Sequence, residues 1–184
     1  MIPDLILRSG TPDDAAVLSL FATRTFRDAF ESEVPPDAMA RYLAESFAVE
    51  RVRAELADHA AAFILATDQG NALLGYAKLY FGSPLPEVRG TNPVKLWRLY
   101  TEKERQNRGI GGWLLARAVT VAGERGGETL WLTVNKGNTG AVRFYERNGF
   151  VTTGYTTFDL GGELHHDFVM EKPIGGGRPR SSSL

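Results

Sequence analysis

The sequence predicts a single α/β domain with an α+β-like mixed sheet. The chain has 184 residues, enough for one well-buried domain and too few for two full ones. Residues 94–134 follow the strand, helix, strand order of a βαβ unit. Apolar runs on either side of this unit are separated by turn residues, as in antiparallel sheets. We expect the domain to occupy residues 1–173 and residues 174–184 to form a flexible tail rich in Gly, Pro and Ser.

The N-terminal third is predicted to be mostly helical. After a short apolar strand over residues 5–8, residues 11–14 supply a capping Thr, a Pro at the first helical position and two acids at the positive end of a helix. Apolar residues then recur at helical spacing until residues 35–36, both Pro, interrupt the pattern. Two further amphipathic stretches follow, through residues 42–43 and 52–56.

The middle of the chain predicts a β-hairpin and a long loop. Apolar runs over residues 61–67 and 73–81 are joined by residues 68–71, whose Asp-Gln-Gly-Asn sequence suits a tight turn. The Pro-rich loop over residues 83–93 is long enough for contact with a substrate. A surface loop that contacts no substrate is an equally good interpretation of this segment.

The βαβ unit consists of a strand over residues 94–101, a helix over residues 110–123 and a strand over residues 129–134. A right-handed crossover makes its two strands parallel, so the loop before the helix lies at the carboxyl end of the first strand. Ligands of open α/β sheets favour that end.

The C-terminal part is predicted to contain one more helix and two more strands. The helix covers residues 138–148 and stops at Gly149. The strands cover residues 150–160 and 164–171 and are joined by a turn at residues 161–162, both Gly.

Composition excludes several classes of function. A formal net charge of −1 argues against an extended nucleic-acid surface. The absence of Cys removes disulfides, thiolate metal sites and thiol nucleophiles. The N-terminus does not read as a signal peptide, and no apolar run approaches membrane-spanning length. We therefore expect a cytoplasmic protein with neither a nucleic-acid nor a membrane partner, and we leave open whether it forms a homodimer.

A glycine-rich loop between the first strand and the helix of the βαβ unit can bind an anion. Its residues are Gln106, Asn107, Arg108, Gly109, Ile110, Gly111 and Gly112. The glycines allow backbone amides to approach a ligand, and the unpaired amides of the first helical turn favour a diphosphate. Lys103, Arg105 and Arg108 add positive charge, which Glu102 and Glu104 partly offset. A turn that only permits close packing is the alternative.

Two common phosphate loops fit this segment poorly. The Walker pattern Gly-x-x-x-x-Gly-Lys-Ser/Thr does not occur. The dinucleotide pattern Gly-x-Gly-x-x-Gly fails because Leu114 stands where the third Gly is needed. The remaining pattern is Gln-x-x-Gly-x-Gly at the start of a helix.

This pattern, together with residues 135–150 (Asn-Lys-Gly-Asn-Thr-Gly-Ala-Val-Arg-Phe-Tyr-Glu-Arg-Asn-Gly-Phe), resembles the GNAT superfamily of N-acetyltransferases. The resemblance is close over residues 94–171, and residues 26–56 are similar to a polyamine-acetyltransferase-like branch. It implies a mostly antiparallel central sheet of about six to seven strands with a splayed parallel central pair, flanked by helices.

The resemblance also implies a reaction, in which an acetyl group passes from acetyl-CoA to a primary amine of a small molecule or peptide. Acetyl-CoA is then the acyl-donor substrate, and no metal is needed. By resemblance, the backbone of Leu99, Tyr100 and Thr101 binds pantetheine and polarises the thioester, and Asn138 contacts the donor. A non-catalytic acyl-CoA sensor is the alternative.

Tyr145 is the predicted catalytic residue. By resemblance its hydroxyl lies near the thioester sulfur, and a phenol with a pKa of about 10 remains a proton donor at neutral pH. Seven residues separate it from Asn138, so we expect both side chains on one face of one helix. The alternative is that Phe144 and Tyr145 form an aromatic pair of the core.

The general base is not identified by the sequence. A primary ammonium is only ~10⁻³ deprotonated at pH 7, so some group must accept its proton. The candidates are Glu31, Glu33, Glu102, Glu104, His165, His166 and Asp167. Adjacent strand residues face opposite ways, so at most one of the two His faces a cleft. His59 is expected to be exposed at a helix end.

Two positions depart from the family pattern. Lys103 stands where relatives often carry Pro, and Lys95 stands where some polyamine-type relatives carry an acid. A Lys at that place would repel a polycation, so the acceptor is left open.

Overall fold

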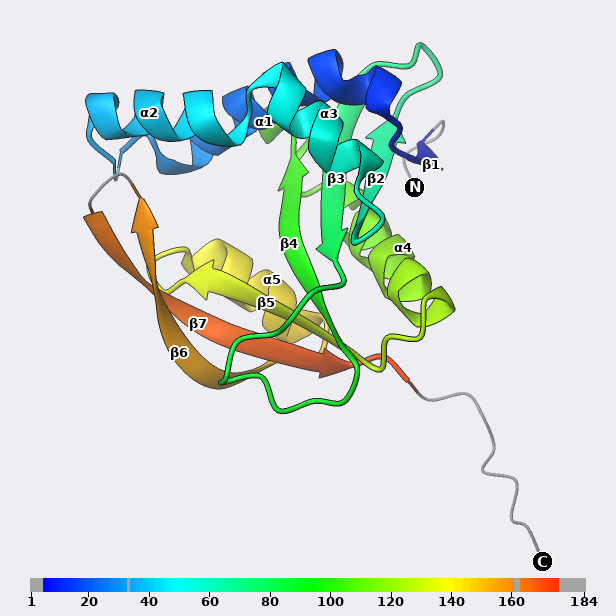
Figure 1. Cartoon of the computed structure of the whole chain (residues 1–184), viewed down its shortest axis with the longest axis vertical. Helices are drawn as coiled ribbons and strands as arrows, with labels where there is room; N and C mark the ends of the chain where they lie inside the picture. Colours follow the sequence, from blue (N-terminus) through cyan, green and yellow to red (C-terminus); the bar gives the residue numbers. More distant parts are fainter. Residues whose placement is uncertain (1–4, 33, 161–162, 176–184) are drawn as a thin grey trace, which may run out of the picture.

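The computed structural model describes residues 5–32, 34–160 and 163–175. A seven-stranded sheet with the order β1-β2-β3-β4-β5-β7-β6 forms the centre of the molecule (Figure 1). Its strands are β1 Ile6–Ser9, β2 Ala61–Thr67, β3 Leu73–Tyr80, β4 Pro93–Thr101, β5 Thr129–Asn135, β6 Val151–Leu160 and β7 Glu163–Pro173. The expected turn at residues 161–162 and most of the expected tail, residues 176–184, lie outside the described residues.

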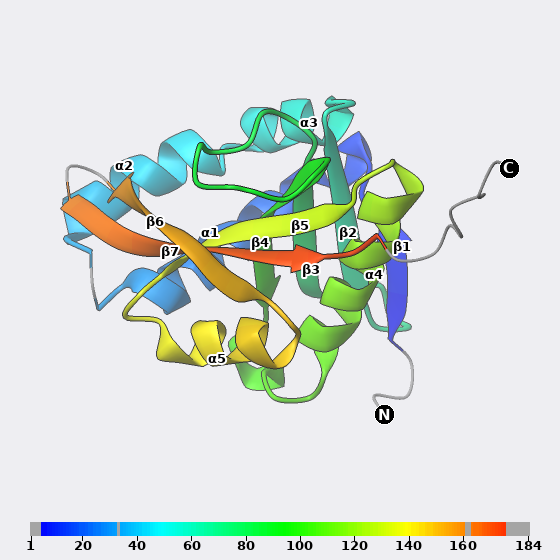
Figure 2. The ribbon, with the colours of Figure 1, turned by 90° about the horizontal axis from the view of Figure 1, so that it is seen from below.

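Helices cover both faces of the sheet. They are α1 Ala15–Phe30, α2 Pro36–Ser46, α3 Val49–Ala57, α4 Ile110–Glu124 and α5 Thr139–Arg147. The first three enclose an apolar core against β2 and β3, while α4 and α5 enclose a second core on the opposite face. Figure 2 shows α4 and α5 on the side of the sheet away from α3. None of the helices in the described ranges is long and apolar enough to cross a bilayer.

The start of the first helix differs slightly from its expectation. Residues 12–14 form a short 3₁₀ turn, and α1 begins only at Ala15. The Asp14 carboxylate accepts a hydrogen bond of 2.9 Å from the amide of Thr11 and is also bound by Arg8 at 2.6 Å. Asp14 therefore stabilises the 3₁₀ turn, and α1 begins after this turn.

The sheet is antiparallel except for one central pair. Strands β4 and β5 are parallel, and their ladder contains only three residue pairs, ending at Lys95 and Trp131. Beyond that point the strands diverge, which leaves backbone groups of β4 without a partner on the β5 side. The predicted mostly antiparallel sheet with a splayed parallel pair is confirmed.

A β-bulge interrupts β4 one residue after the ladder with β5 ends. Lys78 of β3 pairs with Arg98, and the next residue of β3 pairs with Leu96, so Trp97 is an extra residue. The bulge changes which face of the sheet the following side chains reach. Leu96 and Leu99, three residues apart, both pack toward α4, whereas Tyr100 packs toward α1.

The long loop over residues 81–92 lies at the amino end of β4. The amides of Arg89 and Gly90 donate hydrogen bonds of 3.0 and 2.8 Å to the Glu171 carboxylate of β7. This loop lines neither of the cavities described below. The structure therefore does not bring it to the carboxyl end of β4, where the glycine-rich loop lies (Figure 1).

Candidate active site

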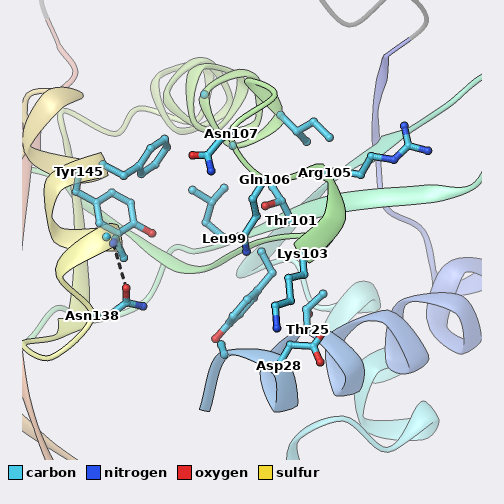
Figure 3. A pocket seen from close by; sticks show the side chains of 18 of the residues that line it. Thr25, Asp28, Leu99, Thr101, Lys103, Arg105, Gln106, Asn107, Asn138 and Tyr145 are labelled. Carbon is cyan, nitrogen blue, oxygen red and sulfur yellow. Dashed lines mark hydrogen bonds between the residues drawn. The ribbon is translucent and has the colours of Figure 1, made fainter. Parts of the chain in front are cut away.

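A cavity of about 910 Å³, the larger cavity, lies where β4 and β5 diverge. Its wall is formed by the end of α1, the carboxyl end of β4, the glycine-rich loop, the start of α4 and one side of α5 (Figure 3). The predicted site residues that line it are Leu99, Tyr100, Thr101, Gln106, Asn107, Gly109, Ile110, Gly111, Gly112, Asn138 and Tyr145. Arg108 is exposed and does not line the cavity.

The glycine-rich loop presents the first turn of α4 to this cavity. Gly109 has a left-handed backbone with a φ of 89° and caps the helix. The first helical hydrogen bond runs from the Trp113 amide to the Gly109 carbonyl at 3.1 Å, so the amides of Ile110, Gly111 and Gly112 precede the helical ladder. A Cβ at Gly111 would meet no atom closer than 3.6 Å, and one at Gly112 would meet none within 4 Å. The amides therefore adjoin open space where an anion gains hydrogen bonds and favourable helix-dipole energy.

Charged side chains surround the loop. Lys103 and Arg105 line the larger cavity, as does Asp28 from α1. Glu102 forms ion pairs with Arg24 at 2.9 Å and with Arg105 at 3.9 Å. Glu102 therefore tethers the loop to α1 and is not free to act as a base.

Asn138 lies just before α5, which corrects the expectation that it projects from the same helical face as Tyr145. The helix begins at Thr139, and the Asn138 Oδ1 accepts a hydrogen bond of 3.0 Å from the Ala141 amide (Figure 3). Asn is favoured at this position because its side chain satisfies an amide that the helix leaves unpaired. Asn138 and Tyr145 nevertheless line the same cavity.

Tyr145 packs against two aromatic neighbours and lines the larger cavity. Its ring centroid lies 5.3 Å from that of Phe144 and 5.4 Å from that of Phe150, both edge to face. Burial raises the pKa of Tyr145 above its usual value. The phenol therefore stays protonated and can donate a proton or hydrogen bond at neutral pH. The ring packs against Phe144, as the aromatic-pair interpretation expected, and the catalytic role of Tyr145 stays a prediction.

A second cavity of about 260 Å³, the smaller cavity, adjoins the first. The two share a wall that includes Leu99, Tyr100 and Tyr145. Several further aromatic side chains line the smaller cavity, namely Phe26, Phe30, Tyr42, Trp97 and Phe158, and of these Phe30 also lines the larger one. Tyr42 of α2 meets Phe158 of β6 at 6.1 Å between ring centroids, and both rings line the cavity.

Two of the candidate bases line the smaller cavity. His165 and Asp167 reach it from β7, whereas His166 points away and is exposed. Asp167 is only 8% exposed. Burial raises the pKa of its carboxyl, an effect that the charges of His165 and Lys95 oppose. A buried carboxylate with a raised pKa is a stronger base than a solvated one.

The other candidate bases have different surroundings. Glu31 and Glu104 are exposed and line neither cavity, and Glu33 lies outside the described residues. His59 is exposed after the end of α3, as expected. Within the described ranges, no group of three or more His, Asp or Glu side chains is arranged to hold a metal ion.

Sequence reasoning missed the contributions of α1 and the side chain of Arg98. Thr25, Asp28 and Phe30 of α1 line the larger cavity, and Arg98 lines the smaller one. No local pattern marks these residues, because their position depends on how α1 packs across β4 and on the bulge at Trp97.

Comparison with known proteins agrees with this geometry. The model of the Acetyltransferase (GNAT) family matches residues 22–150. An uncharacterized N-acetyltransferase of Mycobacterium tuberculosis is 31% identical over 162 residues, 88% of this chain and 98% of that protein. Another from Lactobacillus delbrueckii subsp. lactis is 29% identical, over 82% of this chain and 86% of that protein. The chain therefore belongs to the GNAT family of acetyltransferases, and it is an enzyme of the N-acetyltransferase class.

Solved structures show the same fold. The PaiA N-acetyltransferase of Thermoplasma acidophilum, in complex with coenzyme A, has a TM-score of 0.75 and 22% identity over 92% of this chain and 98% of that chain. A GCN5-related N-acetyltransferase of Rhodopseudomonas palustris has a TM-score of 0.72 and 20% identity, over 94% and 98%.

Proposed function

We propose that this enzyme transfers the acetyl group of acetyl-CoA to the primary amine of a small molecule or peptide by direct attack in a ternary complex. The observation that carries the proposal is the junction of the two cavities at the divergence of β4 and β5, with Tyr145 lining both. One cavity then holds the donor and the other the acceptor. Direct transfer needs both substrates at one point, and proximity supplies much of the acceleration.

The larger cavity is the proposed donor site. The amides of Ile110, Gly111 and Gly112 bind the diphosphate of acetyl-CoA, and Lys103 and Arg105 add favourable charge. The backbone of β4 from Leu99 onward binds pantetheine, since this edge lacks a strand partner. The coenzyme A bound to the Thermoplasma relative supports a donor of this kind.

The proposed reaction needs one acid and one base. The amine nitrogen attacks the thioester carbonyl carbon, and a β4 amide near Leu99 or Tyr100 stabilises the oxyanion. The carbon–sulfur bond then breaks, and the hydroxyl of Tyr145 donates a proton to the departing thiolate. The substituted nitrogen loses its extra proton as the amide forms, and this proton returns to Tyr145 through water. Asp167 is the proposed base that receives the proton of the acceptor ammonium, directly or through water, because it is the buried carboxylate lining the acceptor side.

A titration followed by an assay tests the proposed function. Calorimetric titration with acetyl-CoA is expected to show saturable binding at one site per chain. Release of free thiol is then measured with amino acids, their amides, polyamines, aminoglycosides and peptides as acceptors, with a reaction lacking acceptor as the control. Binding without thiol release from any amine would identify a non-catalytic acyl-CoA sensor instead. Absence of binding would overturn the proposal altogether.

A further inference from the structure

The smaller cavity has an unusual charge for a site that receives an ammonium group. Lys95 and Arg98 line it from β4, and Asp167 is the carboxylate that faces them among the described lining residues. Cations therefore outnumber carboxylates on this wall. A polycationic acceptor would be repelled by such a site, whereas an anionic group on the acceptor would be attracted.

Arg98 is buried without a carboxylate of its own. Its side chain is 10% exposed, and its ion pair is to the Glu55 Oε2 of α3 at 3.5 Å. The same oxygen lies 2.8 Å from the Nζ of Lys78, whose side chain is 3% exposed. The other oxygen of Glu55 pairs with Arg51 at 3.3 Å. One carboxylate thus serves three cations. Arg51 is 64% exposed and is solvated, so the two buried cations, Lys78 and Arg98, share a single negative charge and one positive charge is left over.

The neighbours of Arg98 do not neutralise it. Its guanidinium carbon lies 4.5 Å from the centroid of the Phe47 ring. Burial raises the pKa of both Tyr76 and Tyr100, which face Arg98, so these phenols are uncharged at neutral pH. The planar guanidinium has five N–H donors in a fork that matches a carboxylate. A carboxylate entering the smaller cavity would supply the missing negative charge.

Lys95 is less suited than Arg98 to bind a carboxylate that enters the smaller cavity. Its Nζ lies 4.8 Å from the ring centroids of both Trp97 and Trp131, between which it is held by cation–π contacts. The charge of Asp167 acts on it from β7. Lys95 and Asp167 therefore offset one another at the β5–β7 side, while Arg98, on the side of α2 and α3, has to share Glu55 with Lys78.

We propose that the acceptor carries a carboxylate beside its amine, and that Arg98 binds that carboxylate. The proposal rests on the proposed function and names the substrate class of the same site. The cavity of about 260 Å³ is small, and its aromatic walls favour an apolar or aromatic side chain. The acceptor class is thus a free amino acid with such a side chain. Its amine points toward Asp167 and the thioester.

Matched acceptors on the wild-type enzyme give the first test. For each proteinogenic amino acid, kcat/KM is compared with that of its α-amide, which keeps the amine and side chain but lacks the negative charge. Phenethylamine, isoamylamine and spermidine extend the comparison. At least one apolar or aromatic amino acid is expected to exceed its amide by about tenfold or more. Equal or better use of the amides, the simple amines or spermidine would overturn this inference and leave the proposed function standing.

An Arg98→Met variant gives the second test. Met fills much of the same volume without charge, so kcat/KM for the preferred amino acid is expected to fall by about tenfold or more, while that for its amide stays within about twofold. Arg117→Met is the matched control, because Arg117 is an exposed residue of α4 that lines neither cavity. It should change neither value.

The outcomes separate a binding role from a structural one. Equal losses for the amino acid and its amide in Arg98→Met would make Arg98 a structural residue and overturn the inference. If the variant does not fold, the wild-type comparison decides alone. No thiol release from any acceptor of either series would overturn the proposed function, and the inference with it.

Discussion

The two cavities are built in different ways although they share β4. The larger cavity consists mainly of consecutive main-chain segments, namely the end of β4, the glycine-rich loop and the first turn of α4. The smaller cavity consists mainly of side chains from α1, α2, β4, β5, α5, β6 and β7. A site made of main chain depends on short sequence patterns, whereas a site made of side chains depends on the packing of distant elements. The larger cavity can therefore be predicted from the sequence, whereas the smaller cavity can be recognised only in the structure.

The largest expected effect comes from blocking the main-chain site. A Glu at position 111 has room to fold, since a Cβ there meets nothing closer than 3.6 Å, but its carboxylate would occupy the space proposed for the diphosphate. Gly111→Glu is expected to weaken acetyl-CoA binding by more than about a thousandfold, roughly 4 kcal/mol. Calorimetric titration measures this. Gly123→Glu, near the other end of α4, is the control and should bind normally. Normal binding by Gly111→Glu would show that the donor lies elsewhere.

Tyr145 lines both cavities, so removal of its hydroxyl should lower the rate of acetyl transfer without weakening the binding of acetyl-CoA. Tyr145→Phe keeps the ring contacts with Phe144 and Phe150 and removes only the hydroxyl. We expect kcat to fall by about a hundredfold, with the Kd for acetyl-CoA unchanged within about twofold. Steady-state assays and titrations give the two numbers. An unchanged kcat would assign the proton transfer to another group.

A change at Asp167 should act on the acceptor side alone. Only its carboxylate form accepts a proton, so kcat/KM is expected to rise with pH through its pKa, which burial places above the ordinary Asp range. Asp167→Asn should lower kcat/KM at neutral pH by about tenfold and remove that acidic limb. His166→Asn, on the exposed face of β7, is the control. A pH profile that keeps its limb in Asp167→Asn would refute the assignment.

The smallest expected effect concerns Asn138, whose role the structure ties to the α5 cap. Asn138→Ala removes the acceptor for the Ala141 amide and should lower the free energy of unfolding by about 1 kcal/mol. Asn138→Ser keeps a capping oxygen and should retain most of the stability. Thermal and denaturant unfolding measure both. If the Ala variant keeps full stability but loses acetyl-CoA affinity, Asn138 acts mainly on the donor, as its resemblance implies.

The contrast between a main-chain site and a side-chain site also explains which features could be predicted from the sequence. The βαβ unit, the hairpin over residues 61–81 and the glycine-rich loop follow from periodicity and turn residues, and all lie close to their expected bounds. The position of Asn138 was misjudged by one residue, since a cap and a first helical residue look alike in sequence. Arg98 and α1 could not be assigned to the site, because packing across the sheet carries no local signal.

The bulge at Trp97 has a consequence for how this enzyme can change over time. Without that extra residue, Arg98 would follow Leu96 directly, so regular alternation would keep Leu99 on the side of α4 and Tyr100 on the side of α1. A single-codon deletion of Trp97 would thus remove the bulge and leave the side chains of both faces in place. The face on which Arg98 lies is therefore compatible with a β4 that is one residue shorter.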